Sequence, residues 1–414
     1  VAVTKIAPTC AVKKLTAETD FTATDGTGKI LSGKVDCVTL ERGSLSVGAN
    51  YGECLSEVSG IYGVYGFGNK IAYAADGGIF VVNDASHDKL FAADFADKPY
   101  IFVACGENAT AYLFADEKLY VSGSGDMLAD LAGRVITDAA VCGGRLFCAI
   151  GRGLFYADVG SRCFGYAENG DGGKINFSSD IQALCACGDK LYVFAGEVYV
   201  VETSFDHEYF TVKRVAAAFR KVNYAAMLNN KIYCFTSGGL YALDKPSVKL
   251  KPTLGNPAET VCRPCAFDGK LYFCDCDGTY AYDPESGAEE VSSMSFTTLA
   301  SDGKNLYACD GTHVFRRDNT ALAPDWQSKA VDFGIAGRKH LRKLSVKGVG
   351  SISVTVYGGG REFTLQLDDA DGTTVDAPCY IDGNSFVVYA KFGDDSRVDK
   401  IKLVGVSYQK EVNV

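Results

Sequence analysis

The sequence predicts an all-β protein whose central part is a β-propeller of six or seven blades. Three observations lead to this prediction: a phrase that recurs along the chain, residue pairs typical of tight hairpin turns, and short strand-like runs without helical periodicity. An N-terminal β segment (1–60) and a C-terminal antiparallel β module (321–414) are expected to flank the propeller (61–320).

The recurring phrase consists of a turn, a basic residue, Leu or Ile and an aromatic residue, followed by a second strand that carries another aromatic residue. Self-similarity of this kind is typical of repeat architectures, so each copy is interpreted as part of one blade. The seven copies are Gly68-Asn69-Lys70-Ile71, Glu117-Lys118-Leu119-Tyr120, Gly144-Arg145-Leu146-Phe147, Asp189-Lys190-Leu191-Tyr192, Asn230-Lys231-Ile232-Tyr233, Gly269-Lys270-Leu271-Tyr272 and Gly303-Lys304-Asn305-Leu306-Tyr307.

The spacing of the copies favours blades of four strands. Most steps between successive basic residues come near the ~40–50 residues of such a blade. The step from Lys118 to Arg145 is only 27 residues, which suggests that one copy is truncated. The second aromatic residue lies ten residues after the basic one in four copies, as from Lys231 to Tyr241.

Turn residues separate the strand-like runs. Asp-Gly pairs tolerate the positive φ values that two-residue hairpin turns require, and Val, Ile, Tyr and Phe between the turns suit a half-buried pleated surface. The segment from Asp130 to Ala140 is the one stretch where a helix competes with this interpretation. The Asp-Gly pairs are Asp268-Gly269, Asp277-Gly278, Asp302-Gly303 and Asp310-Gly311.

The two ends of the chain lack the phrase. Residues 1–60 contain strand-like pieces, which predict either a strand that closes the propeller ring or an arm that reaches a neighbouring molecule. After Asp318, a Pro324-Asp325-Trp326 corner leads into alternating apolar residues, which favour a small antiparallel sandwich over a divergent last blade. These residues are Ile352, Val354 and Val356, then Phe363, Leu365 and Leu367, then Phe386 and Val388, then Ile401 and Leu403.

Composition narrows the range of partners. The chain has 414 residues and a formal net charge of −10, which argues against a dedicated nucleic-acid binder but suits a surface that DNA slides past. No apolar run approaches the ~18 residues of a membrane-spanning helix, and residues 1–5 lack the layout of a secretory signal, so an unexported chain is expected.

Sixteen cysteines raise the question of a metal site. Cys262-Arg263-Pro264-Cys265 with Cys274-Asp275-Cys276 has a spacing that suggests zinc. If Asp268-Gly269 is the turn, strand alternation places Cys265, Cys274 and Cys276 on one face and Cys262 on the other, which cannot close a tetrahedron. These cysteines, and Cys185-Ala186-Cys187, are therefore expected to be small buried thiols between blades, with no zinc.

No other group of residues predicts catalysis or a cofactor. The histidines are His87, His207, His313 and His340, and none has metalloprotease spacing. His207-Glu208 beside Asp206 is interpreted as a solvated turn. Asp368-Asp369-Ala370-Asp371-Gly372 only partly matches a calcium loop.

Two further kinds of residue are assigned structural roles. Gly358-Gly359-Gly360 and Gly151-Arg152-Gly153 are interpreted as hairpin tips rather than phosphate loops. The basic residue that opens each repeat is expected on a solvated edge of the ring. No catalytic, cofactor-binding or metal-binding residue is assigned, and no cofactor is expected.

Two segments resemble the β-propeller proteins of short-tailed bacteriophages, which include tail nozzle, hub and stabilisation proteins. They are Val35-Asp36-Cys37-Val38-Thr39-Leu40-Glu41-Arg42-Gly43-Ser44-Leu45, and Trp326-Gln327-Ser328-Lys329-Ala330-Val331-Asp332-Phe333-Gly334 followed by Arg338-Lys339-His340-Leu341-Arg342-Lys343-Leu344. The resemblance implies a non-catalytic structural component of the virion tail or neck, assembled in the host cytoplasm. It implies a homo-oligomer that contacts portal, adaptor or tail-fibre proteins and lets DNA pass through a channel without specific binding.

Two other functions stay open. A carbohydrate- or protein-binding propeller would present an aromatic patch on one rim. A hydrolase or lyase on the same scaffold would need convergent carboxylates or a metal in the central pocket. Fold alone does not choose among the three.

Overall fold

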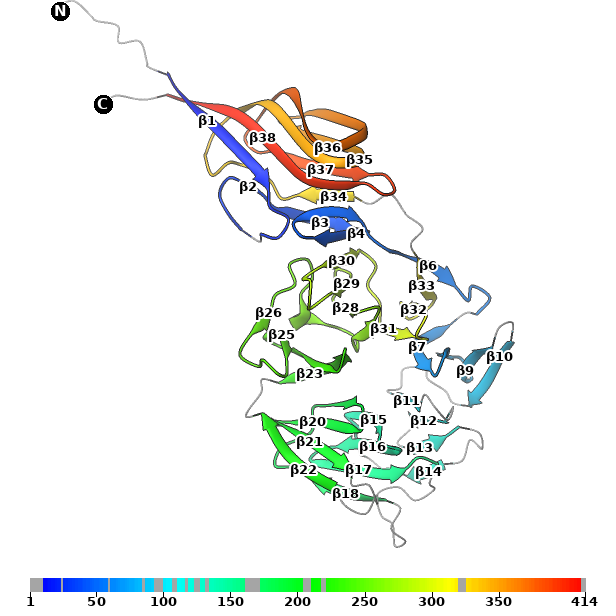
Figure 1. The fold of residues 1–414 in the computed structure, drawn as a ribbon. Coiled ribbons are helices and arrows are strands. Elements are labelled where there is room, and N and C mark those ends of the chain that lie inside the picture. Colours follow the sequence, from blue (N-terminus) through cyan, green and yellow to red (C-terminus); the bar gives the residue numbers. More distant parts are fainter. Residues whose placement is uncertain are drawn as a thin grey trace, which may run out of the picture. The chain divides into compact units, whose positions relative to one another are not determined.

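The computed structural model describes residues 10–23, 25–58, 60–83, 86–92, 100–105, 110–115, 118–122, 127–130, 134–160, 172–203, 210–216, 221–318 and 325–410. These residues form β-strands and one 3-10 helix, η1 (Pro257–Glu259), so the all-β prediction is confirmed (Figure 1). The chain divides into two compact units: unit 1 comprises 1–50, 285–293 and 318–414, and unit 2 comprises 51–284 and 294–317.

Unit 2 is the propeller, and its blades are successive antiparallel sheets (Figure 1). The first and second blades are β7 (Ile61–Phe67), β8 (Lys70–Ala75), β9 (Gly78–Asn83) and β10 (Ser86–Phe91), then β11 (Ile101–Cys105), β12 (Thr110–Ala115), β13 (Lys118–Val121) and β14 (Met127–Asp130). The third and fourth are β15 (Asp138–Cys142), β16 (Arg145–Ile150), β17 (Gly153–Asp158) and β18 (Gly172–Asn176), then β19 (Ala183–Cys187), β20 (Lys190–Ala195), β21 (Glu197–Thr203) and β22 (Phe210–Ala216).

The fifth blade is β23 (Val222–Leu228), β24 (Lys231–Thr236), β25 (Gly239–Ala242) and β26 (Lys249–Leu250). The sixth position holds β27 (Cys265–Phe267), β28 (Lys270–Cys274) and β29 (Thr279–Tyr282). The last blade is β31 (Thr298–Ser301), β32 (Leu306–Cys309), β33 (Val314–Asp318) and β6 (Asn50–Cys54).

The first strands of the blades form a closed ring. Contacts run in the order β7, β11, β15, β19, β23, β27, β31 and back to β7. Six four-stranded sheets occupy this ring together with β27, β28 and β29, which belong to the larger sheet that continues through β30, and this confirms the prediction of six or seven blades. β6, from the start of the chain, is the outer strand of the last blade, so of the two roles predicted for the N-terminal segment this strand has the ring-closing one.

The hydrophobic core of the propeller lies between neighbouring blades. One cluster joins the first two blades through Phe67, Phe91 and Leu113, and another joins the last blade to the first through Ile61 and Val314. Similar clusters join the second and third, third and fourth, fourth and fifth, and sixth and last blades. Each blade covers both faces of its sheet by packing against the blade on either side.

In six of the seven copies, the recurring phrase opens the second strand of a blade. The second blade differs: Lys118 opens β13, which is its third strand, while its second strand is β12. The short step to Arg145 therefore reflects a displaced copy of the phrase, and the prediction of a truncated copy was wrong. All four strands are present in that blade.

The ten-residue spacing of the second aromatic residue has a register explanation. It places this residue on the third strand, opposite the side chain three positions after the basic residue, so that Phe80 pairs with Tyr73 and Tyr280 with Phe273. The ring centroids of both pairs are 5.5 Å apart in stacked geometry. Cross-strand aromatic pairs of this kind stabilise a sheet.

Unit 1 is built from strands of both chain ends. Its strands are β1 (Cys10–Thr19), β2 (Lys29–Ile30), β3 (Ser32–Asp36), β4 (Val38–Glu41), β5 (Ser44–Val47), β30 (Glu289–Ser292), β34 (Asp325–Ser328), β35 (Lys339–Gly358), β36 (Arg361–Gly383), β37 (Val387–Phe392) and β38 (Arg397–Lys410). Hydrogen bonds connect them in the order β30-β4-β5-β38-β35-β37-β34-β3, with β36 beside β35 and β1 beside β38.

Most of the alternating residues predicted to face a core in this unit do so, but Phe363, Leu365 and Leu367 on β36 are only half-buried. Ile352, Val354 and Val356 on β35 are buried, as are Ile401 and Leu403 on β38. Asp325 and Trp326, predicted to form a corner with Pro324, already lie in β34, so that part of the prediction was wrong; Pro324 lies outside the described residues.

The predicted N-terminal segment, 1–60, divides between the two units after residue 50. Strands β34–β38 pair within unit 1 rather than forming a further blade. In the part of the chain that the structure describes, no helix has the length and apolar character needed to cross a membrane.

Candidate functional site

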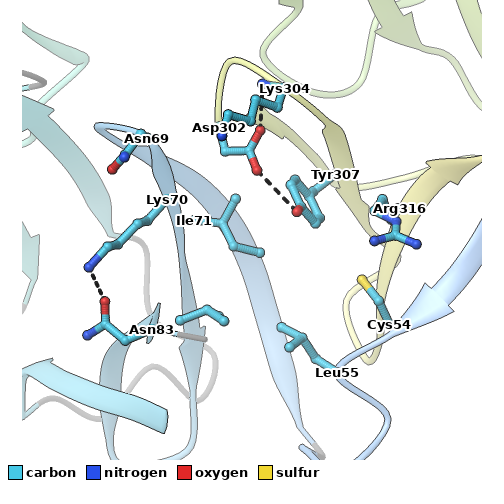
Figure 2. A pocket seen from close by; sticks show the side chains of 11 residues that line it. Cys54, Leu55, Asn69, Lys70, Ile71, Asn83, Asp302, Lys304, Tyr307 and Arg316 are labelled. Atoms are coloured by element: carbon cyan, nitrogen blue, oxygen red, sulfur yellow. Dashed lines mark hydrogen bonds between the residues drawn. The ribbon is translucent and has the colours of Figure 1, made fainter. Parts of the chain in front are cut away.

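A polar pocket lies where the last blade meets the first, in unit 2. It has a volume of about 440 Å³. Asn69, Lys70 and Asn83 come from the first blade, and Asp302, Lys304, Tyr307 and Arg316 from the last, with Cys54, Leu55, Ile71 and Val82 completing the wall (Figure 2).

Two copies of the recurring phrase position the polar side chains of this pocket. Asn69 lies in the turn before β8 and Lys70 is the first residue of that strand, and Lys304 lies in the corresponding turn before β32. The Asp302 carboxylate fixes the second turn, because its Oδ1 accepts hydrogen bonds from the backbone N–H groups of Lys304 at 2.7 Å and Asn305 at 2.6 Å. Side-chain capping of a tight turn by Asp is a common device.

The pocket combines three cationic side chains with one carboxylate. Burial acts to raise the pKa of Asp302, but hydrogen bonds from the Asn305 and Lys304 N–H groups outweigh it and hold that pKa below its usual value. Burial, together with the Asp302 charge, raises the pKa of Tyr307 to about 12, so its hydroxyl stays protonated and donates to Asp302 Oδ2 at 3.2 Å. Lys70 donates to Asn83 Oδ1 (Figure 2).

The pocket carries more cationic than anionic side chains. Burial raises the pKa of the Cys54 thiol to about 11, with a partial opposing effect from Arg316, so this thiol is protonated near neutral pH. Histidine does not line the pocket. The excess of cations suits an anionic ligand.

Four of the seven basic residues that open the repeats are solvent-exposed, as predicted, whereas Lys118 and Lys270 are half-buried. Lys70, Lys190, Lys231 and Lys304 are exposed, and Lys190 pairs with Glu202 at 3.0 Å across the β20–β21 ladder. Arg145 is instead buried, so the expected solvated edge was wrong at this position. The long side chain folds inward over aromatic rings, where its planar guanidinium can stack.

Arg145 connects two strands of its blade with a ring from the next. Its Nε donates to Asp158 Oδ1 at 2.8 Å, and its guanidinium lies 4.6 Å from the Phe210 ring centroid. We expect Arg145→Ala to lower the free energy of unfolding by about 2–3 kcal/mol, because it removes both contacts from a buried place. Urea denaturation measures the change. Arg145→Lys is the control, and it should recover part of the loss by keeping the charge without the planar stack.

A second polar cluster crosses the centre of the propeller. Asp138 on β15 is buried, and its Oδ2 accepts a hydrogen bond from Leu184 N–H on β19 at 2.8 Å. Its Oδ1 accepts from the Arg263 guanidinium, which precedes β27. Because β19 and β23 separate β15 from β27 in the ring, this ion pair bridges blades that are not neighbours.

Asp138 is the only acidic residue in the first strands of the seven blades. A hydrolase of the kind considered above needs a second carboxylate or a metal beside it. Asp138 is instead engaged by an arginine and by backbone N–H groups, which is the pattern of a structural ion pair.

The cysteines of the suggested zinc spacing come together differently from the prediction. The β27–β28 register pairs Cys265 with Tyr272, as expected. Pro264 cannot donate to the ladder, which starts at Cys265, so alternation does not extend to Cys262. Cys262 hydrogen-bonds to Cys274, and this contact and burial raise the pKa of the Cys262 thiol. The placement of Cys262 and Cys274 on opposite faces was therefore wrong.

Cys276 lies outside this group. It is exposed in the turn after β28, so the prediction of a buried thiol was wrong for Cys276, while Cys262 and Cys274 belong to the core cluster between the sixth and last blades. Cys185 is buried in the cluster between the fourth and fifth blades, as predicted, and Cys187 packs against that cluster partly buried. Further thiols fill clusters of this kind: Cys148, Cys234, Cys142 and Cys309.

Thiol labelling should follow this burial. We expect maleimide to modify Cys276 in the native protein and to modify Cys148 and Cys234, both fully buried, only after denaturation. The negative charge of Asp277 raises the pKa of Cys276, so its labelling rate should increase as the pH rises and the thiolate fraction grows. Peptide mass mapping gives the rates, and early modification of Cys148 would contradict the assignment.

The remaining predicted residues have structural surroundings. In the described residues, the one group with metal-ligand proximity is Asp275, Cys276 and Asp277, but Asp275 Oδ1 already accepts from the Asp277 and Gly278 N–H groups. His207, Glu208 and Asp206 lie outside the described residues.

The partial calcium loop lies within β36, and the two glycine-rich segments connect β35 to β36 and β16 to β17 as hairpin tips, as predicted. His87 contacts the Tyr73 hydroxyl, His313 contacts Asp310 and His340 contacts Asp382.

No protein-family model and no curated protein matches the sequence. Among solved structures, PorZ, an essential surface component of the type-IX secretion system of Porphyromonas gingivalis, is 12% identical with a TM-score of 0.44, and the match covers 76% of this chain and 46% of PorZ. The Pan2 WD40 domain of Neurospora crassa is 10% identical with a TM-score of 0.44, covering 64% of this chain and 92% of that domain.

The extracellular domain of a putative one-component system from B. thetaiotaomicron is 12% identical with a TM-score of 0.45, covering 79% of this chain and 47% of that one. This chain thus spans less than half the length of PorZ and of the B. thetaiotaomicron domain. These likenesses concern the fold, and none of the three is described as a bacteriophage protein.

Proposed function

We propose that this protein is a non-catalytic structural component of a bacteriophage tail or neck. One observation supports the proposal most: the two segments that carry the resemblance to phage propeller proteins pair with each other. β3 and β34 are antiparallel partners, with Val35 opposite Trp326 and Asp36 opposite Asp325. The resembling residues, almost 300 positions apart, therefore belong to one sheet.

The proposed role is mechanical. Several copies would assemble around the tail channel and contact portal or adaptor proteins on one side and fibre proteins on the other. The net charge of −10 suits a channel wall that repels DNA rather than binding it. The polar side chains of unit 2 support a structural role, since Arg145, Asp138 and Asp302 hold strands and turns together.

The location of the protein in particles tests this proposal. An antibody against the purified chain is applied to density-purified phage particles from the source culture, with gold labelling read by electron microscopy. We expect label at the tail or neck. A particle fraction that contains no trace of the chain by mass spectrometry would overturn the proposal.

The pocket between the last and first blades favours a second candidate function, the binding of an anionic ligand such as an acidic sugar or a peptide carboxylate. The three cationic side chains Lys70, Lys304 and Arg316 support it. A glycan array with acidic and neutral members tests it, and Lys304→Glu/Arg316→Glu is the matched variant. We expect acidic glycans to bind the parent protein and to bind the variant at least about tenfold more weakly. Equal binding by both proteins would show that this pocket is not the glycan-binding site.

A further inference from the structure

Strand β36 of unit 1 is a long sheet edge. Its 23 residues pair with β35 along almost the whole length, from Arg361 opposite Gly358 to Gly383 opposite Lys339 (Figure 1). In the described part of the chain β35 is its one strand partner. The outward-pointing N–H and C=O groups of such an edge are a template for another strand.

Apolar side chains of β36 are also left partly uncovered. Phe363, Leu365 and Leu367 alternate on one face and are only half-buried, whereas Val354 and Val356 of the adjacent β35 are fully buried. An added strand beside β36 would cover the exposed part of these apolar groups, with a gain proportional to the area removed from water.

β36 is also strongly acidic. It contains six acidic residues and one basic residue. Asp376 pairs with Lys343, and Asp382 pairs with Arg338. The other four form no ion pair among the described residues: Glu362, Asp368, Asp369 and Asp371.

The opposite edge of the same sheet is basic. Strands β36, β35, β38 and β1 are consecutive neighbours, and β1 pairs with β2 only at Glu18 and Thr19. Before those residues β1 has β38 as its one strand partner within the described chain. Lys13 and Lys14 on this stretch are exposed and form no ion pair there.

We propose that β1 of one copy of this chain adds to β36 of a second copy, so that one sheet continues across the interface. Main-chain hydrogen bonds would supply affinity, and the lysines of β1 against the acidic residues of β36 would supply specificity. The two edges differ, so the contact is head-to-tail, and repeating it generates a closed ring or a filament. This inference rests on the oligomerisation in the proposed function and names the surface that carries it.

Features of β36 limit where the added strand can lie. A bulge places Asp368 and Asp369 opposite the single residue Ser351, and Pro378 interrupts the donors further along. Both devices protect edges against unselective pairing. The regular stretch from Arg361 to Leu367 precedes them, and an added strand along it would lie beside Glu362 and end next to Asp368, Asp369 and Asp371.

Charge reversal of each edge tests the interface. The variants are Lys13→Glu/Lys14→Glu and Asp369→Lys/Asp371→Lys, all at exposed positions, with Lys245→Glu/Lys251→Glu in unit 2 as a control of equal charge change. Sedimentation velocity of the full chain at low and physiological salt gives the oligomeric state. We expect oligomers for the parent and control, and at least about tenfold weaker association for each edge variant.

Mixing the two edge variants gives the sharper result. The acidic β36 of one then faces the lysines of the other, and the reversed β1 faces the reversed β36, so mixed oligomers should form although each variant alone associates only weakly. A monomeric parent protein, or oligomers that both reversals leave unchanged, would overturn this interface. Both of these results concern only the interface between copies. Whether the protein is part of a phage particle is decided separately, by the antibody labelling of particles.

Discussion

Replacing Trp326 with alanine is expected to lower the free energy of unfolding of unit 1 by about 3–5 kcal/mol. Trp326 is the only tryptophan and is fully buried. Its ring packs edge-on against Phe21 with centroids 5.3 Å apart, and its Nε1–H donates to Ser32 Oγ at 2.9 Å. The substitution removes the largest side chain of this core and leaves a cavity, because strands on both sides restrict collapse.

Urea denaturation followed by circular dichroism measures this loss, since the variant has no tryptophan to follow by fluorescence. Trp326→Phe is the control: it keeps an aromatic ring beside Phe21 but loses the hydrogen bond to Ser32, so it should cost clearly less. An alanine variant as stable as the parent protein would show that this core is not packed as described.

Replacing Asp138 with alanine is expected to destabilise the propeller by about 3 kcal/mol. The buried carboxylate accepts hydrogen bonds from the Leu184 N–H and from Arg263. Its removal leaves the Leu184 donor without this acceptor, and the cross-ring ion pair is lost.

Two variants separate these contributions. Asp138→Asn keeps an acceptor for Leu184 but removes the charge, and Arg263→Ala removes the cation, whose side chain is about half exposed. Both should cost less than Asp138→Ala in thermal unfolding. A larger loss from Arg263→Ala than from Asp138→Ala would contradict the assignment of Asp138 as the buried anchor.

Local patterns predicted the repeat architecture because each blade repeats the same short-range chemistry. The turn at Asp268-Gly269 has positive φ at both residues, 47° and 74°, as its sequence requires. The same local reasoning failed where one residue changed the register between the sequence pattern and the strands. Lys118 opens a third strand instead of a second, and Pro264 ends the alternation before Cys262.

The site residues could not be predicted, because they are brought together by ring closure. Arg263 reaches Asp138 from 125 positions away, and the pocket combines Lys70 with Lys304 across the first and last blades. The residues of each pair are too far apart in the sequence for any short motif to connect them. Arg145 was misjudged for a related reason: its partner ring, Phe210, belongs to the next blade.

The pairing of β1 with β38 bears on how the protein is made. Cys10 lies opposite Lys410, so β1 pairs with a strand that is synthesised 400 residues later. At typical rates of translation this delay is tens of seconds. Similarly, β6 is synthesised long before β33, the strand with which it pairs in the last blade. Both units should therefore reach their native state only after these later strands have been synthesised, and chaperones that shield unpaired strands should increase the yield of folded protein.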